Sequence, residues 1–221
     1  MPTQAKTPVK AASQEGIRAP SQKRSVERVE AILKAARTLI AAKGSAGLKI
    51  QDIAAEAGIT AGSMYQYFPN KAAILQTLGE RYLGQTAGMI EAKLQSAPQS
   101  RTAFHELLAQ MFDQYYALHR QDPVMRDIWM GTHADKSLQA MDDADTRRNA
   151  EMIFPQVRHL FAKTHWPDVQ RALLLVLSLS GTTVRLALTQ TKSDGQNTID
   201  MAKHMAQSLF DPYFDDRAPR E

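Results

Sequence analysis

The sequence has 221 residues, 43% of them hydrophobic, which is enough to bury one or two substantial cores. It contains no cysteine, which excludes disulfide bridges, thiol nucleophiles and thiolate metal sites. The net charge of +4 is uneven, because residues 1–71 hold 11 basic and 5 acidic residues while the remainder is mildly acidic. This asymmetry is typical of a polyanion-binding module joined to a second unit.

Residues 1–21 are predicted to form a flexible basic arm, because three prolines and few large apolar groups cannot offset the entropy cost of ordering. The arm lacks the apolar core of a secretory signal. The longest apolar run, residues 172–179, is far shorter than the roughly 20 residues of a membrane-spanning helix. We therefore expect a soluble, cytoplasmic protein with no membrane partner.

A first amphipathic helix is predicted from Ser21 to Gly44. Its apolar residues recur at spacings of three and four, which marks one helical face. They are Val26, Val29, Ile32, Leu33, Ala36, Leu39 and Ile40.

Two short helices are predicted next. The first begins near Ile50 and ends at Gly58, which stands where a left-handed cap would stop it. Thr60 is a plausible N-cap for the second, at residues 61–67, which Pro69 and the following asparagine close.

The rest of the chain reads as consecutive helices, with no competing strand pattern and no internal repeat. They are expected at roughly 71–96, 101–120, 122–131, 138–163, 168–191 and 198–210. Proline or glycine signals separate them, at 97–98, 122–123, 166–167 and 193–195. The sequence therefore predicts an all-α fold.

The two short helices and their three-residue turn match the spacing of a DNA-binding helix-turn-helix. Spacing alone is weak support, because many helical bundles contain such a corner. The second helix is unusually polar, whereas Ile59, Met64 and Phe68 can anchor it to a core. A helix that served only for packing would seldom be so polar.

Two segments resemble the signature of the TetR family of transcriptional regulators. They are residues 53–59 (Ile-Ala-Ala-Glu-Ala-Gly-Ile) and 62–71 (Gly-Ser-Met-Tyr-Gln-Tyr-Phe-Pro-Asn-Lys), and the resemblance covers about residues 24–83. It implies a three-helix DNA-binding domain at 22–70 and a helical ligand-binding and dimerisation domain at 71–221. It also implies a cytoplasmic homodimer, usually a repressor, that a small molecule releases from a palindromic operator.

The resemblance places residues 61–67 in the major groove and Lys71 on a phosphate. Gln66 can pair with an adenine edge, and tyrosine hydroxyls can bond phosphate oxygens. The expected DNA-binding residues are Lys49, Gln51, Thr60, Ala61, Gly62, Ser63, Tyr65, Gln66, Tyr67 and Lys71. Alternatively, either tyrosine ring could pack in the core with only its hydroxyl outward, and Lys49 could belong to a solvated basic face.

Apolar and aromatic stripes in the C-terminal half are more often plain core than a ligand cavity. The family resemblance raises the second possibility, because such bundles usually enclose a pocket. The expected ligand-binding residues are Phe112, Tyr115, Trp129 and His133. The effector itself is not identified by the sequence, and no cofactor or metal is expected.

The segment 168–191 carries apolar residues on more than one face, which implies a second burial surface. Together with residues 198–210 it should form a four-helix interface between two subunits. The alternative is a central helix buried within one chain.

Enzyme function is not expected. His105-Glu106 begins like a zinc-protease motif, but Ala109 stands where the second histidine would be. Two other classes remain open, namely an α-helical carrier or enzyme for an apolar molecule and a sequence-indifferent DNA architectural protein. The polar second helix and the basic N-terminal third argue against a carrier. The single compact motif argues against an architectural protein.

Overall fold

The computed structural model describes residues 20–131, 135–215, 217 and 219–220. The secondary structure of the described residues is helical, and the β-type pairing among them is an isolated bridge between Phe161 and Phe214. The predicted all-α fold is confirmed.

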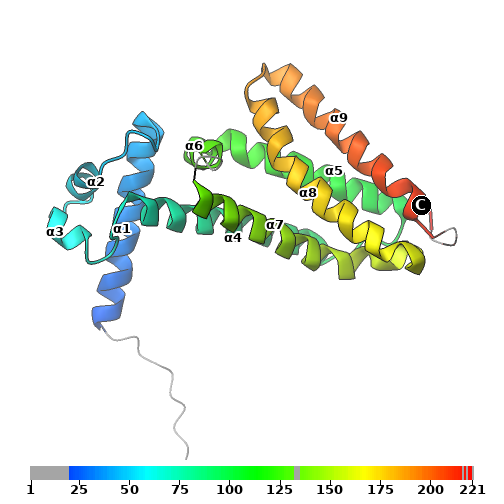
Figure 1. The fold of residues 1–221 in the computed structure, drawn as a ribbon, viewed down its shortest axis with the longest axis horizontal. Coiled ribbons are helices and arrows are strands. Elements are labelled where there is room, and N and C mark those ends of the chain that lie inside the picture. Colours follow the sequence, from blue (N-terminus) through cyan, green and yellow to red (C-terminus); the bar gives the residue numbers. More distant parts are fainter. Residues whose placement is uncertain (1–19, 132–134, 216, 218, 221) are drawn as a thin grey trace, which may run out of the picture.

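Three helices form one end of an elongated molecule (Figure 1). They are α1 (Pro20–Lys43), α2 (Ile50–Glu56) and α3 (Ala61–Met64). Gly44 after α1 and Gly58 after α2 have φ angles of +76° and +64°, the left-handed conformation that glycine adopts most readily. Both predicted stop signals therefore act as expected.

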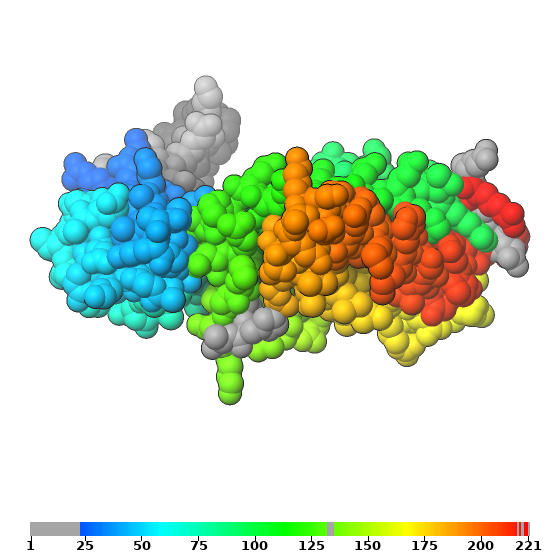
Figure 2. Space-filling model, turned by 90° about the horizontal axis from the view of Figure 1, so that it is seen from above, coloured from blue at the N-terminus to red at the C-terminus, as the bar shows by residue number. Residues whose placement is uncertain are grey.

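Six further α-helices follow. They are α4 (Lys71–Leu94), α5 (Arg101–Gln121), α6 (Pro123–Gly131), α7 (Lys136–Val157), α8 (Trp166–Leu188) and α9 (Lys192–Phe210). Helix α4 runs from the N-terminal helices into the bundle, and α8 and α9 pack side by side (Figure 1). In Figure 2, the N-terminal helices and the C-terminal residues occupy opposite ends of the molecule.

The N-terminal helices share their core with α4 and α6. Ile32 of α1 and Met64 of α3 belong to the same buried cluster as Ile74 of α4 and Met125 of α6. The cluster thus continues beyond the predicted boundary after Asn70, and the division at that residue remains a prediction.

A second core fills the bundle and ends in an aromatic cluster. The ring of Phe104 lies edge-on to those of Phe161, Phe210 and Phe214, with centroid distances of 5.2, 5.0 and 5.8 Å. Such edge-to-face pairs stabilise a core beyond the area they bury. This cluster draws together the end of α9 and the segment that follows α7.

The predicted helix at 138–163 was too long, because α7 ends at Val157. Short 3₁₀ turns follow at Arg158–Leu160 and Lys163–His165, and another at Asp211–Tyr213. Between the first two, the Ala162 amide donates to the Tyr213 carbonyl at 3.1 Å. The α-helix ends here because the segment after Val157 pairs with the C-terminal segment around Tyr213 and buries Phe161.

The break predicted at residues 193–195 was also misplaced. Thr191 caps α9, which begins at Lys192 and contains Gly195. A Cβ atom on Gly195 would lie 2.5 Å from the Ala187 carbonyl oxygen and 2.6 Å from the Tyr116 hydroxyl. The glycine therefore permits close packing of α9 on α8 and α5 and does not end a helix.

Candidate DNA-binding site and ligand cavity

The turn between α2 and α3 is fixed by backbone hydrogen bonds. The Gly58 amide donates to the Ala55 carbonyl at 3.1 Å, and the Ile59 amide donates to the Ala54 carbonyl at 2.9 Å. This is the Schellman arrangement that satisfies the last carbonyls of a helix when a left-handed residue follows it. The direction in which the chain enters α3 is therefore set locally.

Helix α3 is short, anchored on one side and open on the other. Thr60 is its N-cap, as predicted, and its Oγ1 accepts a hydrogen bond from the Ser63 amide at 3.1 Å. Met64 and Phe68 are buried in the N-terminal core, and Ile59 packs against that core. The regular helix ends at Met64, so residues 65–67 continue as turns rather than as the longer helix expected.

The predicted DNA-binding residues are all exposed or half-buried in the structure. Tyr65 is 52% exposed, whereas Tyr67 is half-buried and packs against the core. Tyr67 is thus the ring for which the packing alternative holds. Exposed members are Lys49, Gln51, Thr60, Gly62, Tyr65 and Gln66, and half-buried members are Ala61, Ser63, Tyr67 and Lys71.

Lys71 has partners within the chain. Its Nζ donates to the carbonyl oxygens of Ser45 and Ala46, each at 3.3 Å. It thereby ties the start of α4 to the loop before α2. A phosphate contact by Lys71 remains a prediction, and this ammonium would have to share its donors between loop and phosphate.

One acidic residue of α2, Asp52, is paired. Lys43 donates to the Asp52 carboxylate, and this hydrogen bond holds the pKa of Asp52 below its usual value. Lys49 lowers it further through its charge. Lys23, Arg24 and Arg28 are exposed on the first turns of α1, beside the exposed Glu27.

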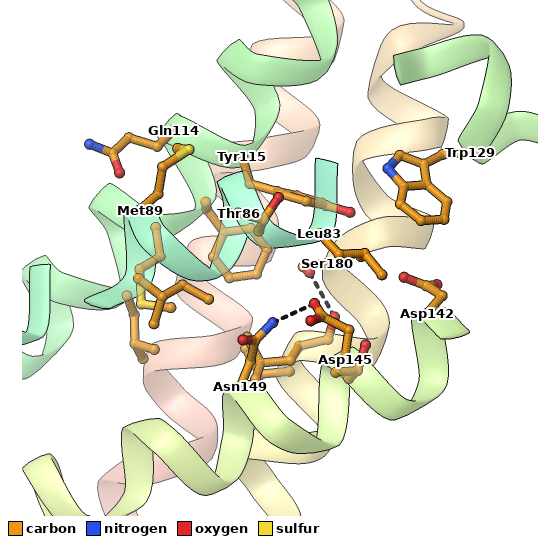
Figure 3. Close-up of a pocket in the computed structure, with 17 residues that line it drawn as sticks. Leu83, Thr86, Met89, Gln114, Tyr115, Trp129, Asp142, Asp145, Asn149 and Ser180 are labelled. Carbon is orange, nitrogen blue, oxygen red and sulfur yellow. Dashed lines mark hydrogen bonds between the residues drawn. The ribbon is translucent and has the colours of Figure 1, made fainter. Parts of the chain in front are cut away.

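A cavity lies inside the bundle, between α4, α5, α7 and α8 (Figure 3). Its volume is about 80 Å³ on a scale where one water needs roughly 10–15 Å³, so it has room for a small ring compound or several waters. Three of the predicted ligand-binding residues, Phe112, Tyr115 and Trp129, line it. The fourth, His133, lies outside the described residues.

Helix α7 contributes the carboxylates and a buried amide to the lining of the cavity (Figure 3). Asp145 and Asn149 are only 3% and 5% exposed, and the Asn149 Nδ2 donates to the Asp145 Oδ2 at 2.8 Å. Arg148 donates to the other carboxylate oxygen from a largely exposed position. Two buried acceptor-bearing side chains thus line the cavity beside its apolar residues.

Sequence reasoning missed Asp145 and Asn149. A signal was present, because these two residues lie on the same stripe of α7 as the buried Leu138 and Ile153. Polar residues on the apolar stripe of a helix face a core or a ligand, since a buried polar group needs a partner.

Helix α6 connects the cavity with the N-terminal helices. Its Trp129 lines the cavity, and its Asp127 Oδ2 accepts a hydrogen bond from the Ser45 amide at 2.7 Å. Asp122, just before α6, pairs with Arg37 of α1 at 2.9 Å. A shift of α6 would therefore displace the loop before α2 and helix α1, to which it is bonded.

Asp122 remains ionised in this junction. Burial alone would raise its pKa, but hydrogen bonds from the Met125 amide and from Arg37, with a further one from the Val124 amide, hold the pKa below its usual value. The same carboxylate thus caps α6 and binds α1.

Two family models match the chain. "Bacterial regulatory proteins, tetR family" matches residues 32–78, and "Tetracyclin repressor-like, C-terminal domain" matches residues 102–212. The chain belongs to the TetR family. The resemblance seen in the helix-turn-helix thus extends, through the second model, over the bundle.

Known TetR-family proteins resemble the chain to different extents. The uncharacterized HTH-type transcriptional regulator YerO of Bacillus subtilis (strain 168) is 36% identical over 90 residues, which is 39% of this chain. The match covers only 31% of YerO, so the chain spans less than a third of that relative.

Two solved structures share the TetR fold over most of both chains. A TetR-family transcriptional regulator from Streptomyces coelicolor has a TM-score of 0.66 at 22% identity, covering 87% of this chain and 100% of that one. The complex of triclosan with SmeT, the repressor of a Stenotrophomonas maltophilia multidrug efflux pump, has a TM-score of 0.63 at 21% identity. It covers 86% of this chain and 93% of SmeT.

Within this TetR fold, α8 and α9 leave a large apolar surface exposed. Helix α8 buries one side in the bundle, yet its other side is open. The exposed residues are Leu174, Leu175, Leu179 and Leu186 of α8 and Met201 and Met205 of α9. We call these six residues the α8–α9 face. By length and composition Lys163–Leu188 could also cross a membrane, but a helix with one packed side and one open apolar side passes the same test.

Proposed function

We propose that the chain is a homodimeric transcriptional repressor that binds a palindromic operator and releases it when a small molecule occupies the bundle cavity. The observation that carries the proposal is the anchored α3 with its exposed polar edge. Gln66 and Tyr65 project from a motif whose core side is buried, and base edges are read by such exposed polar groups. This arrangement suits a major groove better than it suits packing.

The α8–α9 face supports the dimer. Six large apolar side chains on two adjacent helices are exposed in the single chain, and contiguous apolar patches of this kind mark interaction surfaces. A two-fold axis there would join two α8–α9 pairs into a four-helix interface. The two α3 helices should then enter successive major grooves about 34 Å apart.

The position of α6 supports release by a ligand. Trp129 faces the cavity, and Asp127, two residues earlier, binds the loop that leads into α2. A ligand that favours a different position of α6 or α4 would shift the DNA-binding helices, and DNA and ligand would then oppose each other. Such coupling is reciprocal, so a ligand that weakens operator binding must itself bind the operator complex more weakly by the same factor.

A selection from random DNA duplexes tests the proposal. We expect enrichment of a palindrome whose half-sites are separated by about one helical turn. Recovery of sequences without two-fold symmetry would contradict the dimeric arrangement. If no sequence were enriched over competitor DNA, the chain would not be a sequence-specific regulator, and the carrier or enzyme alternative would gain weight.

A further inference from the structure

Helix α7 supplies carboxylate and amide acceptors to the cavity, beside the hydroxyls of Thr86, Thr146 and Ser180 and the amide of Gln114. Asp145 carries two carboxylate oxygens with about four lone-pair directions between them, of which Arg148 and Asn149 occupy two. Asp142, one helical turn earlier, adds a second carboxylate to the lining. Among the described residues that line this cavity there is no lysine, arginine or histidine.

Asn149 adds an acceptor that has no partner. Its amide nitrogen faces the Asp145 carboxylate, which can only accept, so the orientation of the amide is fixed by chemistry. Its Oδ1 is buried and has no hydrogen-bond partner among the described residues. An unsatisfied buried acceptor is costly, and a donor brought in by a ligand would remove that cost.

Tyr115 stays a neutral hydroxyl at this end of the cavity. Burial raises its pKa, and the negative charge of Asp142 raises it further. The hydroxyl can therefore accept a hydrogen bond from a ligand without becoming charged. Its ring, with those of Phe112 and Trp129, offers π faces that attract cations.

Positive charges surround the cavity without lining it. Arg148 is mostly exposed and approaches Asp145 from outside. Arg126 and Arg185 line a neighbouring smaller hollow, together with His119 and Asp142. The cavity lining therefore contains acceptors, whereas the guanidinium groups of these three arginines lie outside it.

We infer that the ligand of this cavity is an organic cation, in which a protonated amine binds Asp145 and Asn149 and a hydrocarbon or aromatic body lies among the apolar residues. The inference rests on the proposed ligand-responsive function and specifies the ligand class. The apolar part of the lining is formed by Leu83, Met89, Ile90, Leu108, Met111, Phe112, Val176 and Leu177. An organic anion would meet two carboxylates and an unpaired carbonyl there.

Three probes with the same phenylethyl skeleton test the inference on the whole protein without DNA. They are 2-phenylethylamine, protonated at neutral pH, 2-phenylethanol, which is neutral, and 3-phenylpropionate, which is an anion. Binding is followed by the indole N–H resonance of Trp129, which the variant Trp166→Phe distinguishes from the second tryptophan. We expect the amine to bind on the order of tenfold or more tightly than the alcohol, since charge-assisted hydrogen bonds are the stronger ones.

Two matched variants locate the preference. Asp145→Asn should remove most of the preference for the amine, while Asp143→Asn, an exposed carboxylate on the same helix outside the cavity, should keep it. Equal binding of amine and alcohol, preferential binding of the propionate, or no shift of Trp129 with any probe would overturn the inference. The comparison of probes on the unmutated protein stands even if Asp145→Asn fails to fold.

These results are separate from the test of the proposed function. If the protein selects a palindromic operator but binds the propionate in preference to the amine, the proposed function stands and the inference of a cationic ligand is wrong. A protein that binds the amine but selects no DNA would lose the function alone.

Discussion

The Asp127 carboxylate of α6 accepts a hydrogen bond from the Ser45 amide at 2.7 Å, 82 positions earlier in the chain. Ser45 follows Gly44, whose left-handed conformation turns the chain out of α1. One side chain from the bundle thus holds the first loop of the DNA-binding motif. The strength of this contact can be measured directly.

Asp127→Ala should lower the free energy of unfolding by about 1–3 kcal/mol, because it leaves the half-buried Ser45 amide without its acceptor. Asp127→Asn keeps an oxygen in the same place and should lower it less. Urea unfolding of the two variants and the parent checks this. If alanine and asparagine had equal effects, the hydrogen bond to Ser45 would contribute nothing.

Gly195→Ala should destabilise the protein by about 1–3 kcal/mol, the usual effect of overpacking, because its Cβ would meet the Ala187 carbonyl and the Tyr116 hydroxyl. Gly84→Ala is the matched control in α4, where a Cβ would meet nothing within 4 Å. It should be neutral or stabilising by up to about 1 kcal/mol, because alanine is the better helix former. Thermal unfolding of both variants gives the comparison, and equal melting temperatures would refute it.

Leu179→Glu should split the proposed dimer, because a carboxylate buried at the proposed interface without a partner would cost several kcal/mol. Val26→Glu replaces an equally exposed residue on α1, far from the α8–α9 face, and should leave the assembly unchanged. Sedimentation velocity at micromolar concentration measures both. An unmutated protein that sediments as a monomer would contradict the dimer before any variant is made.

Lys49→Ala and Gln66→Ala should weaken DNA binding in different ways. Loss of Lys49, if it contacts a phosphate, should lower affinity for all sequences and reduce the salt slope by roughly one unit. Loss of Gln66 should remove about 1–3 kcal/mol of preference at one position in each half-site. Titrations against the selected operator and its single-base variants, at several salt concentrations, separate the two effects. A uniform loss with Gln66→Ala would exclude its contact with a base edge.

His119 should make stability depend on pH. Burial lowers its pKa below the usual value near 6.5, an effect only partly offset by the ring's hydrogen bond to the Tyr115 carbonyl. The unfolded chain therefore takes up this proton at a higher pH than the folded chain. The stability from the neutral ring is complete above about pH 6.5 and is lost as pH falls toward the folded pKa.

The variant His119→Gln keeps an N–H donor but does not titrate. Its unfolding free energy should fall less steeply below pH 6.5 than that of the parent, by at most about 1.4 kcal/mol per pH unit. The exposed His159 offers a control, since His159→Gln should follow the parent. Urea titrations at several pH values reveal the difference, and parallel curves for all three proteins would show that His119 is not the cause.

The sequence predicted the helices best where local chemistry sets their ends. Gly44, Gly58 and Thr60 act at short range, so their roles could be assigned without knowing the fold. Gly195 was wrongly predicted to break a helix. It is required by a close contact between helices, which no local sequence pattern reveals. The end of α7 was mispredicted for a similar reason, because residues 160–162 form backbone hydrogen bonds with residues 213–215 and do not continue the helix.

In the candidate sites, too, features set by local sequence could be predicted and features set by contacts between helices could not. The exposure of the polar residues at α3 could be predicted, because a short polar helix flanked by apolar anchor residues is recognisable from the sequence pattern. Phe112, Tyr115 and Trp129 were expected to lie together, and all three line the cavity, although their role in ligand binding remains a prediction. Asp145 and Asn149 were not expected, because their significance depends on which face of α7 is buried.

The N-terminal core shared with α4 and α6 implies that helices α1 to α3 are not an autonomous folding unit. A fragment ending at Asn70 would lack Ile74, Leu78, Met125 and Ile128, which are almost wholly enclosed in the intact chain. The two ends of the molecule should therefore melt cooperatively, and hydrogen exchange in α2 should slow when the bundle is stabilised. A substitution that loosens the core of the N-terminal helices is therefore expected to destabilise the bundle as well, and the reverse.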